Sequence, residues 1–217
     1  MDVIKEICKS YPFLKEFDKE LLDLFSDRII LNNYKVGESV FNNKVSCIGF
    51  SFILGGRLRV YKLGDDGKEI TLYRLGKGDN CFNTILCALT ESDEVSFAEV
   101  EENALIAILP MDLFKKYLLN NTGFLKYIFK NLYIKFEDVV EGLQKVTFDS
   151  IENRIIDYFN TTMSNNNGSK IIYTTHERIA ADIGSSREVV SRSLKSLEKR
   201  GIVELGRGKI KIKNWIY

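Results

Sequence analysis

Residues 174–200 read TTHERIAADIGSSREVVSRSLKSLEKR and contain two short helix signals joined by a glycine turn. Ile179, Ala180 and Ile183 give the first segment an apolar face, and Gly184 supplies the left-handed conformation that commonly ends a helix. The second segment carries more arginine than a purely structural helix needs. Together they predict a helix-turn-helix, in which the second helix reads DNA.

Both helix starts show the spacing of a capping box. Thr174 stands three residues before Glu177, and Ser185 stands three residues before Glu188. In a capping box each side chain satisfies a backbone N–H that the first helical turn leaves without a partner. The spacing therefore predicts caps at Thr174 and Ser185, and Gly201 is expected to end the second helix.

The second helix separates into an apolar side and a polar, basic side. Val189, Val190, Leu194 and Leu197 lie on the inner side at helical spacing. The outer side, together with the start of the first helix, is free to face a duplex. The residues expected to contact DNA are Thr175, His176, Ser186, Arg187, Glu188, Ser191, Arg192 and Lys195.

Two alternating runs, 202–205 and 209–213, follow the second helix and flank a Gly-Arg-Gly turn at 206–208. Glycines between β-prone runs predict a tight hairpin, which adds a wing to the helix pair. From residue 185 onward there are nine Lys and Arg against three Asp and Glu, a local net charge of +6. Such a field suits a phosphate backbone. The alternative is a structural helix pair with a solvated basic face.

The composition of the whole chain is that of a globular protein. Of its 217 residues, 45% are hydrophobic and 28% are charged, and the formal net charge is +1. Residues 1–146 carry a net charge of −3 and residues 147–217 a net charge of +4, so the basic end coincides with the predicted DNA reader.

The predicted compartment is the cytoplasm, with no membrane partner. No run approaches the roughly 18 apolar residues of a membrane span, and the first residues do not resemble a signal peptide. Cys8, Cys47, Cys81 and Cys87 include no C-x-x-C pair and are expected to be reduced. Burial in the core is the ordinary role of such cysteines, and redox or metal sensing is the alternative.

Between residues 29 and 109 the pattern changes to short β-prone runs separated by glycine, after a helical start at 1–27 that breaks at Pro12. Gly55-Gly56 and Asp65-Asp66-Gly67 are hairpin signals, so a sandwich or barrel is predicted. The expected strands are 39–41, 48–53, 57–63, 69–74, 96–100 and 104–109.

A barrel of this kind is also compatible with a cupin-like metal enzyme, which needs several His and carboxylate ligands inside it. The only histidine, His176, lies in the other half of the chain. The sequence also has no Walker loop, dinucleotide fingerprint or nucleophile triad. We therefore expect no catalytic residues, no metal ligands and no enzymatic activity. A small-molecule-binding β-domain that acts through protein partners is a further alternative.

Residues 111–146 return to a helical pattern with an unbroken heptad seam, whose apolar residues are spaced 3, 4, 3, 4 and 3 apart. The seam consists of Phe129, Leu132, Phe136, Val139, Leu143 and Val146. It either packs on the β-domain or pairs with the same helix of a second copy, and its length favours a homodimer.

A new helix is predicted after the seam, because Asp149 and Glu152 have capping-box spacing. The expected domains are a sensor domain at 1–110, a dimerisation helix at 111–146 and a winged helix-turn-helix at 147–217.

The stretch SREVVSRSLKSLE at 186–198 resembles the recognition helix of the Crp/Fnr superfamily, the cyclic-AMP receptor protein and its relatives. The order of Gly37-Glu38, Gly56, Gly67 and Gly78-Asp79 resembles the sensor domain of the same superfamily, so the resemblance covers nearly the whole chain. It implies an α+β protein with an N-terminal β-roll, which is a cupin-like double-stranded β-helix, followed by a long dimerisation helix and a C-terminal winged helix-turn-helix.

The same resemblance implies a homodimeric transcription regulator that binds a palindromic operator and is controlled through the β-roll by an effector or redox signal. An activator of this type would also contact RNA polymerase. Arg187, Glu188 and Arg192 are then expected to read G·C pairs, since arginine matches guanine and glutamate accepts from cytosine. The alternative role of Glu188 is only to complete the Ser185 capping box.

Cyclic-nucleotide-binding members of the family hold their ligand with a Gly-Glu pair and an Arg-Ser or Arg-Thr pair. Here Phe82 and Asn83 stand about where Gly-Glu would be, and Glu94 and Val95 about where Arg-Ser would be. A buried phosphate needs a cation, so an acidic residue at that place argues against cyclic AMP. The expected effector pocket consists of Asn80, Cys81, Phe82, Asn83, Glu94 and Val95.

The sequence leaves the cofactor open. Iron-sulfur members use a cluster of N-terminal cysteines, whereas this chain has only Cys8 there. Haem-binding members commonly use a sensor-domain histidine, and this chain has none. Cys81 and Cys87 flank the expected pocket, which leaves haem-thiolate or thiol redox chemistry as alternatives.

Overall fold

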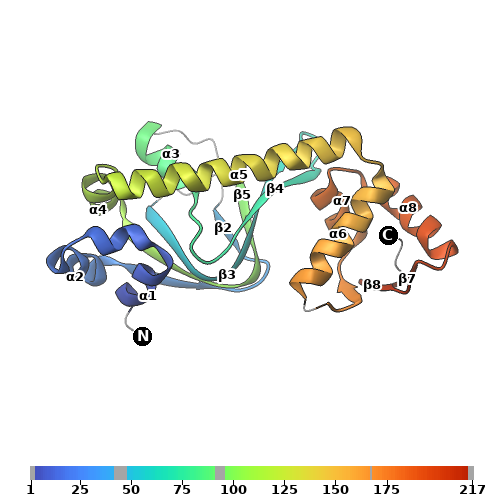
Figure 1. Cartoon of the computed structure of the whole chain (residues 1–217), viewed down its shortest axis with the longest axis horizontal. Coiled ribbons are helices and arrows are strands. Elements are labelled where there is room, and N and C mark those ends of the chain that lie inside the picture. Colours follow the sequence, from blue (N-terminus) through green and yellow to red (C-terminus); the bar gives the residue numbers. More distant parts are fainter. Residues whose placement is uncertain (1–2, 42–47, 91–95, 167, 215–217) are drawn as a thin grey trace. The chain divides into compact units, whose positions relative to one another are not determined.

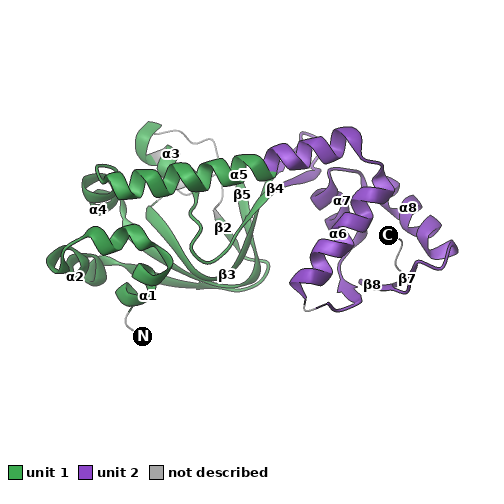
Figure 2. Cartoon of the chain, in the orientation of Figure 1, with its two compact units in different colours: residues 1–61, 72–138 green, residues 62–71, 139–217 purple. Residues whose placement is uncertain are grey.

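The computed structural model describes residues 3–41, 48–90, 96–166 and 168–214. The chain divides into two compact units (Figure 2). Unit 1 comprises residues 1–61 and 72–138, and unit 2 comprises residues 62–71 and 139–217. Within the described residues, no helix combines the length and the apolar character needed to cross a membrane.

Unit 1 begins with the predicted helices. They are α1 (Val3–Ser10), the 3-10 helix η1 (Pro12–Glu16) and α2 (Lys19–Arg28). Pro12 begins η1, as expected of a residue that fixes its own backbone angle and cannot continue α1. Asp18 caps α2 by accepting a hydrogen bond from the amide of Leu21 at 2.8 Å. The predicted helical start with its break at Pro12 is confirmed.

An antiparallel sheet follows (Figure 1). Its strands are β1 (Ile30–Tyr34), β2 (Ser39–Phe41), β3 (Gly49–Leu63), β4 (Glu69–Leu75) and β5 (Phe97–Pro110). They are ordered β1-β5-β3-β4, and β2 also pairs with β5. The predicted β-domain is therefore confirmed.

The expected hairpin at Gly55-Gly56 is wrong, because β3 runs through these residues. Its register against β5 shifts between Ile53 and Arg57. Gly56 has a φ of 83°, and a Cβ there would lie 2.4 Å from the carbonyl oxygen of Asn103. The glycines thus form an irregularity that lets a long strand bend without ending it. Runs 96–100 and 104–109 likewise join into the single strand β5.

The helical segment after the sheet is interrupted. It comprises α4 (Met111–Leu113), the π-helical turn η2 (Phe114–Leu118) and α5 (Thr122–Phe148), so the helix predicted from residue 111 is broken. The side chain of Asn121 accepts a hydrogen bond from the amide of Phe124 at 2.7 Å, which fixes the start of α5. The ring of Phe124 lies 5.7 Å from that of Phe114 and 5.3 Å from that of Phe50, within a buried aromatic cluster.

One helix of unit 1, α3 (Phe82–Thr90), was not predicted. It follows β4 within the expected effector segment, and six of its nine residues are apolar. Phe82, Ile85, Leu86 and Leu89 have helical spacing, but a run of two turns is too short for periodicity alone to distinguish a helix from a strand.

Unit 2 contains the predicted winged helix. Its elements are α6 (Ile151–Asn165), β6 (Ile171–Tyr173), α7 (His176–Ile183), α8 (Arg187–Lys199), β7 (Val203–Gly206) and β8 (Lys209–Ile212). The wing turn is confirmed, with Gly208 at a φ of 69°. The short strand β6 was not predicted, and it completes a sheet of order β6-β8-β7.

Candidate nucleic-acid interface

All three helices of unit 2 begin one residue later than the capping boxes predicted. The caps predicted at Asp149, Thr174 and Ser185 are therefore wrong. Each of them is followed by another residue that can cap, so the spacing to a glutamate does not fix the start. The observed caps, with the amides that donate to them, are Ser150 with Asn153 (3.2 Å), Thr175 with Arg178 (3.1 Å) and Ser186 with Val189 (3.3 Å).

This shift changes the interpretation of Glu188. With Ser186 as the cap, the third helical residue is Val189, so Glu188 does not stand at the reciprocal position of a capping box. Its side chain is exposed. Glu188 therefore does not complete a capping box, which was the alternative to reading a base. Thr174 also has a different role, because its hydroxyl lies 3.1 Å from the hydroxyl of Tyr158.

Hydrogen bonds from a buried arginine stabilise the turn between α7 and α8. Gly184 adopts the predicted left-handed conformation with a φ of 63°. The guanidinium of Arg154, which is only 8% exposed, donates to the carbonyl oxygens of Ile183 at 2.6 Å and Gly184 at 3.3 Å. These carbonyls lie at the negative end of α7, where a cation is favourable. The role of Arg154 was not predicted, because its only signal in the sequence is a charged residue beside the apolar Ile155.

The reading helix α8 separates its two sides as predicted, except that Val189 is only half-buried. Val190, Leu194 and Leu197 are fully buried. On the opposite side, a shallow surface hollow of about 450 Å³ is lined by four of the predicted DNA contacts, Arg187, Glu188, Ser191 and Arg192. The structure therefore brings these four side chains together.

His176 connects the two helices of the motif. It is the first residue of α7, and its Nδ1 lies 2.8 Å from the hydroxyl oxygen of Ser191 on α8. Partial burial lowers the pKa of His176, and the positive charges of Arg187 and Lys195 lower it further. The neutral imidazole is therefore favoured in the free protein.

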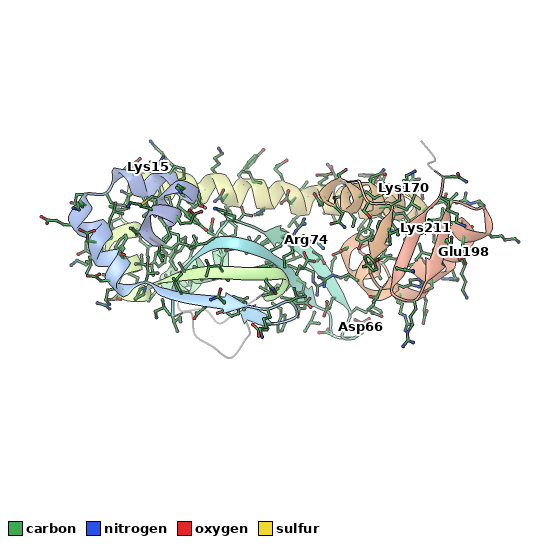
Figure 3. The ribbon with its side chains drawn as sticks, turned by 90° about the horizontal axis from the view of Figure 1, so that it is seen from below. Lys15, Asp66, Arg74, Lys170, Glu198 and Lys211 are labelled. Carbon is green, nitrogen blue, oxygen red and sulfur yellow. The ribbon has the colours of Figure 1, made fainter. Side chains whose placement is uncertain are left out.

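The cations of α8 remain available to a partner. Arg187 makes only a long contact of 3.9 Å with Glu177, and both side chains are exposed. Arg192 and Lys195 form no ion pair with any residue that the structure describes. Beyond α8, Lys209 and Lys211 are exposed on strand β8, and Figure 3 labels Lys211.

The hairpin between β3 and β4 belongs to unit 2 and contacts α7. Its predicted turn is confirmed by Gly67, which has a φ of 76° and donates to the carbonyl of Gly64 at 2.9 Å. Farther along, the hydroxyl of Thr71 donates to the carboxylate of Asp182 at 2.6 Å. No sequence signal indicated that pairing, because 111 residues separate its partners.

The expected effector pocket is described only in part. Asn80 is 1% exposed and accepts a hydrogen bond from the side chain of Asn131 at 3.0 Å. Cys81 is buried, and Phe82 begins α3 with its side chain half-buried. Outside the described part lie the side chains of Asn83 and Cys87 and all of Cys47, Glu94 and Val95.

Unit 1 has a second hollow, of about 430 Å³, that the sequence analysis did not identify. Its charged side chains pair with one another or with their neighbours. Arg74 makes two hydrogen bonds with Glu101, at 2.8 and 3.0 Å, and Figure 3 labels Arg74. Lys135 on α5 lies 3.3 Å from Asp79. The hollow is lined by Gly56, Arg57, Arg74, Leu75, Gly76, Asp79, Glu102, Lys135 and Asp138.

Metal ligands do not gather in the part of the chain that the structure describes. There, no group of three or more His, Cys, Asp or Glu side chains is placed to hold a metal ion.

An antiparallel sensor-type sheet, a long helix and a winged helix-turn-helix together define a class, the ligand-controlled transcription regulators that bind DNA. Residues 153–216 match the family model of the Crp-like helix-turn-helix domain, and residues 31–121 match that of the cyclic nucleotide-binding domain. The chain belongs to the Crp/Fnr superfamily. The predicted resemblance, the fold and the function as a Crp/Fnr-type DNA-binding transcription regulator are confirmed.

Relatives extend over nearly the whole chain. A Crp/Fnr family regulator of known structure from Eubacterium rectale is 29% identical, with a TM-score of 0.85 and coverage of 94% of each chain. The cyclic AMP receptor protein of Thermus thermophilus is 24% identical over 209 residues, again 94% of each chain. The c-di-GMP responsive regulator CLP of Xanthomonas campestris shares the fold, at 17% identity, a TM-score of 0.76 and coverage of 91% of this chain and all of that one.

Proposed function

We propose that this regulator binds a two-fold symmetric operator as a homodimer and reads G·C pairs in each half-site with Arg187, Glu188 and Arg192. The observation that carries the proposal is the hollow on α8, where these three side chains converge on the exposed side of a helix whose other side is buried. Arginine matches the O6 and N7 acceptors of guanine, and glutamate accepts from the amino group of cytosine.

The other predicted contacts then position the duplex. Lys195 is a cation on the same helix, suited to a phosphate. Thr175 and Ser186 stand at the N-termini of α7 and α8, where backbone N–H groups favour an anion. Such contacts fix the register of the protein on DNA without reading sequence.

The seam on α5 supports the dimer. Phe129, Phe136 and Leu143 are 67%, 59% and 65% exposed, although they are large apolar residues at heptad positions. Leu132, Val139 and Val146 continue the same exposed row. A seam that packed on the β-domain of its own chain would be buried. A second copy would cover it and place two reading helices for the half-sites of a palindrome.

The effector of the proposed regulator is not cyclic AMP. The support is the sequence, in which Glu94 stands about where the resemblance to cyclic-nucleotide-binding members would put the phosphate-binding arginine. We expect calorimetry to show no binding of cyclic AMP or cyclic GMP at micromolar concentrations. Saturable binding that changes DNA affinity would contradict this part of the proposal.

Direct reading is tested by binding-site selection followed by affinity measurements on the selected duplex and on random DNA. Arg192→Ala should cost about 1–3 kcal/mol on the selected site and little on random DNA, because it removes a base contact. Lys195→Ala is the matched control from the same helix face, and it should weaken both kinds of DNA together. If the Arg192 variant selects the parent's motif, the assignment fails.

A further inference from the structure

The chain's single histidine joins the start of one helix to the reading side of the other. His176 follows the cap Thr175 and is the first residue of α7. Its Nδ1 contacts the hydroxyl of Ser191, which lines the hollow on α8 together with Arg187 and Arg192. A change at the imidazole therefore acts directly on a group that faces the proposed DNA site.

We propose that His176 positions the Ser191 hydroxyl for DNA and takes up a proton when the duplex binds, so that DNA affinity is linked to pH. This inference rests on the proposed function, since it assigns a further positioning residue to the same interface.

The protonation state of His176 decides which hydrogen bonds His176 and Ser191 can make. If the neutral ring has its proton on Nε2, Nδ1 accepts, and the Ser191 hydroxyl must donate to the ring. If the neutral ring has its proton on Nδ1, Nε2 carries a lone pair and has no N–H to donate to a phosphate oxygen. Only the cation has both N–H groups. Its Nδ1–H donates to Ser191, whose own O–H is then free to donate to a DNA acceptor.

The charges around His176 determine the direction of the linkage. Burial and the cations Arg187 and Lys195 on α8 hold its pKa below the ordinary value in the free protein. On α7 itself, the exposed carboxylate of Glu177 is directed at Arg187, at 3.9 Å. A bound phosphate backbone compensates the two cations and adds negative charge beside the ring, which favours the protonated form.

The sign follows from these pKa values. The DNA-bound state holds more protons than the free state between the free pKa, which is below 6.5, and the higher pKa of the complex. Affinity must therefore rise as the pH falls through this interval and stay constant above it. Each unit by which DNA raises the pKa corresponds to about a tenfold gain in affinity at low pH.

A single histidine makes the direct test simple, because its imidazole Cε1–H gives one histidine resonance in the proton NMR spectrum. We would titrate that resonance in the free protein and in the complex with a selected operator duplex. The expected result is a higher midpoint in the complex. An equal or lower midpoint overturns the proposal, whatever the variants show.

Affinities measured by fluorescence anisotropy between pH 5.5 and 7.5 at fixed salt test the positioning role. His176→Asn keeps an amide that can reach Ser191 but does not titrate, so its affinity should not change with pH. Ser191→Ala should lose more affinity at low pH than at high pH, because the cation always leaves the Ser191 hydroxyl free to donate, whereas the neutral ring with its proton on Nε2 occupies it. The control is Glu20→Gln, which removes an exposed carboxylate on α2, outside the proposed DNA site, and should retain the slope of the parent.

The outcomes distinguish a failure of the His176 proposal from a failure of the proposed DNA reading. Specific binding with the same pH slope in the parent and in His176→Asn refutes the role of His176 and leaves the DNA-binding proposal intact. Equal affinity for the selected and random duplexes at every pH refutes the proposed base reading itself.

Discussion

The reading helix of unit 2 and the charged hollow of unit 1 use their charges in opposite ways. On α8, Arg192 and Lys195 have no ion-pair partner among the described residues and face solvent. In the hollow, Arg74 is paired with Glu101, and Lys135 is paired with Asp79. A surface that meets phosphate needs cations that are still free, whereas a ligand entering the hollow must exchange an existing ion pair. The cations of α8 are therefore available to an anionic partner, whereas Arg74 and Lys135 are already neutralised.

The largest expected effect concerns the third kind of surface, the apolar seam on α5. Phe136→Glu together with Val139→Glu would bury two like charges from each copy at the proposed dimer interface, at about 3–5 kcal/mol for each unpaired charge. We expect the double variant to be monomeric by light scattering and to lose affinity for a palindromic duplex.

The control for the seam is Leu24→Glu on α2, an exposed leucine outside it, which should leave the dimer intact. Circular dichroism would show whether the seam variant retains its helices. A double variant that is folded and dimeric would mean that the seam does not form the interface.

The next prediction compares the loss of an arginine side chain in unit 2 with the loss of one in unit 1. Arg154→Ala removes a buried guanidinium that donates to two carbonyls, so the free energy of unfolding should fall by about 3 kcal/mol. Arg57→Ala removes a partly exposed side chain that lies 3.8 Å from each of two carboxylates, and it should cost no more than about 1 kcal/mol. Urea denaturation measures both. Equal losses would show that burial does not distinguish the two arginines.

A smaller effect tests whether the exposed charges of α8 read bases. Glu188→Gln should relax the preference at one base pair by about 2 kcal/mol and leave the fold and binding to random DNA nearly unchanged. Binding-site selection gives the result, with Glu177→Gln as the control on α7. Should the Glu188 variant keep the parent's full motif, its carboxylate does not read cytosine.

The smallest effect tests the cap of α8. Ser186→Ala removes the side chain that accepts from Val189 and should lower stability by about 1 kcal/mol. Ser185→Ala, one residue earlier, should change it by much less. Thermal unfolding of the two variants decides between the observed cap and the predicted one, and a larger loss in the Ser185 variant would favour the prediction.

The winged helix was predictable because its signals are local. The apolar residues of α8, the left-handed Gly184 and the turn before Gly208 each act within a few residues of their own position. The capping errors in unit 2 are of the same local kind. Where two neighbouring residues can both cap, as at Ser185 and Ser186, the capping-box spacing selected the wrong one.

Unit 1 and the inner support of the motif depend on contacts between distant residues, which a single sequence does not reveal. Gly56 looked like a hairpin because its positive φ suits a turn, but its close approach to Asn103 on β5 makes it an irregularity within a strand. Arg154 and Thr71 likewise act through partners 29 and 111 residues away. The helical spacing of apolar residues in α3 covers only two turns, which is too short to identify a helix by itself.

The clamp that Arg154 places on the helix-turn-helix bears on the speed of recognition. Since the carbonyls of Ile183 and Gly184 are already bound and Gly184 already has its helix-ending conformation, α8 is ordered before DNA arrives. Little conformational entropy remains to be lost at the turn on binding. Encounter should then be set by the field of the exposed cations, with an association rate that falls steeply with salt and is similar for good and poor operators. Operators should therefore differ mainly in the dissociation rates of their complexes.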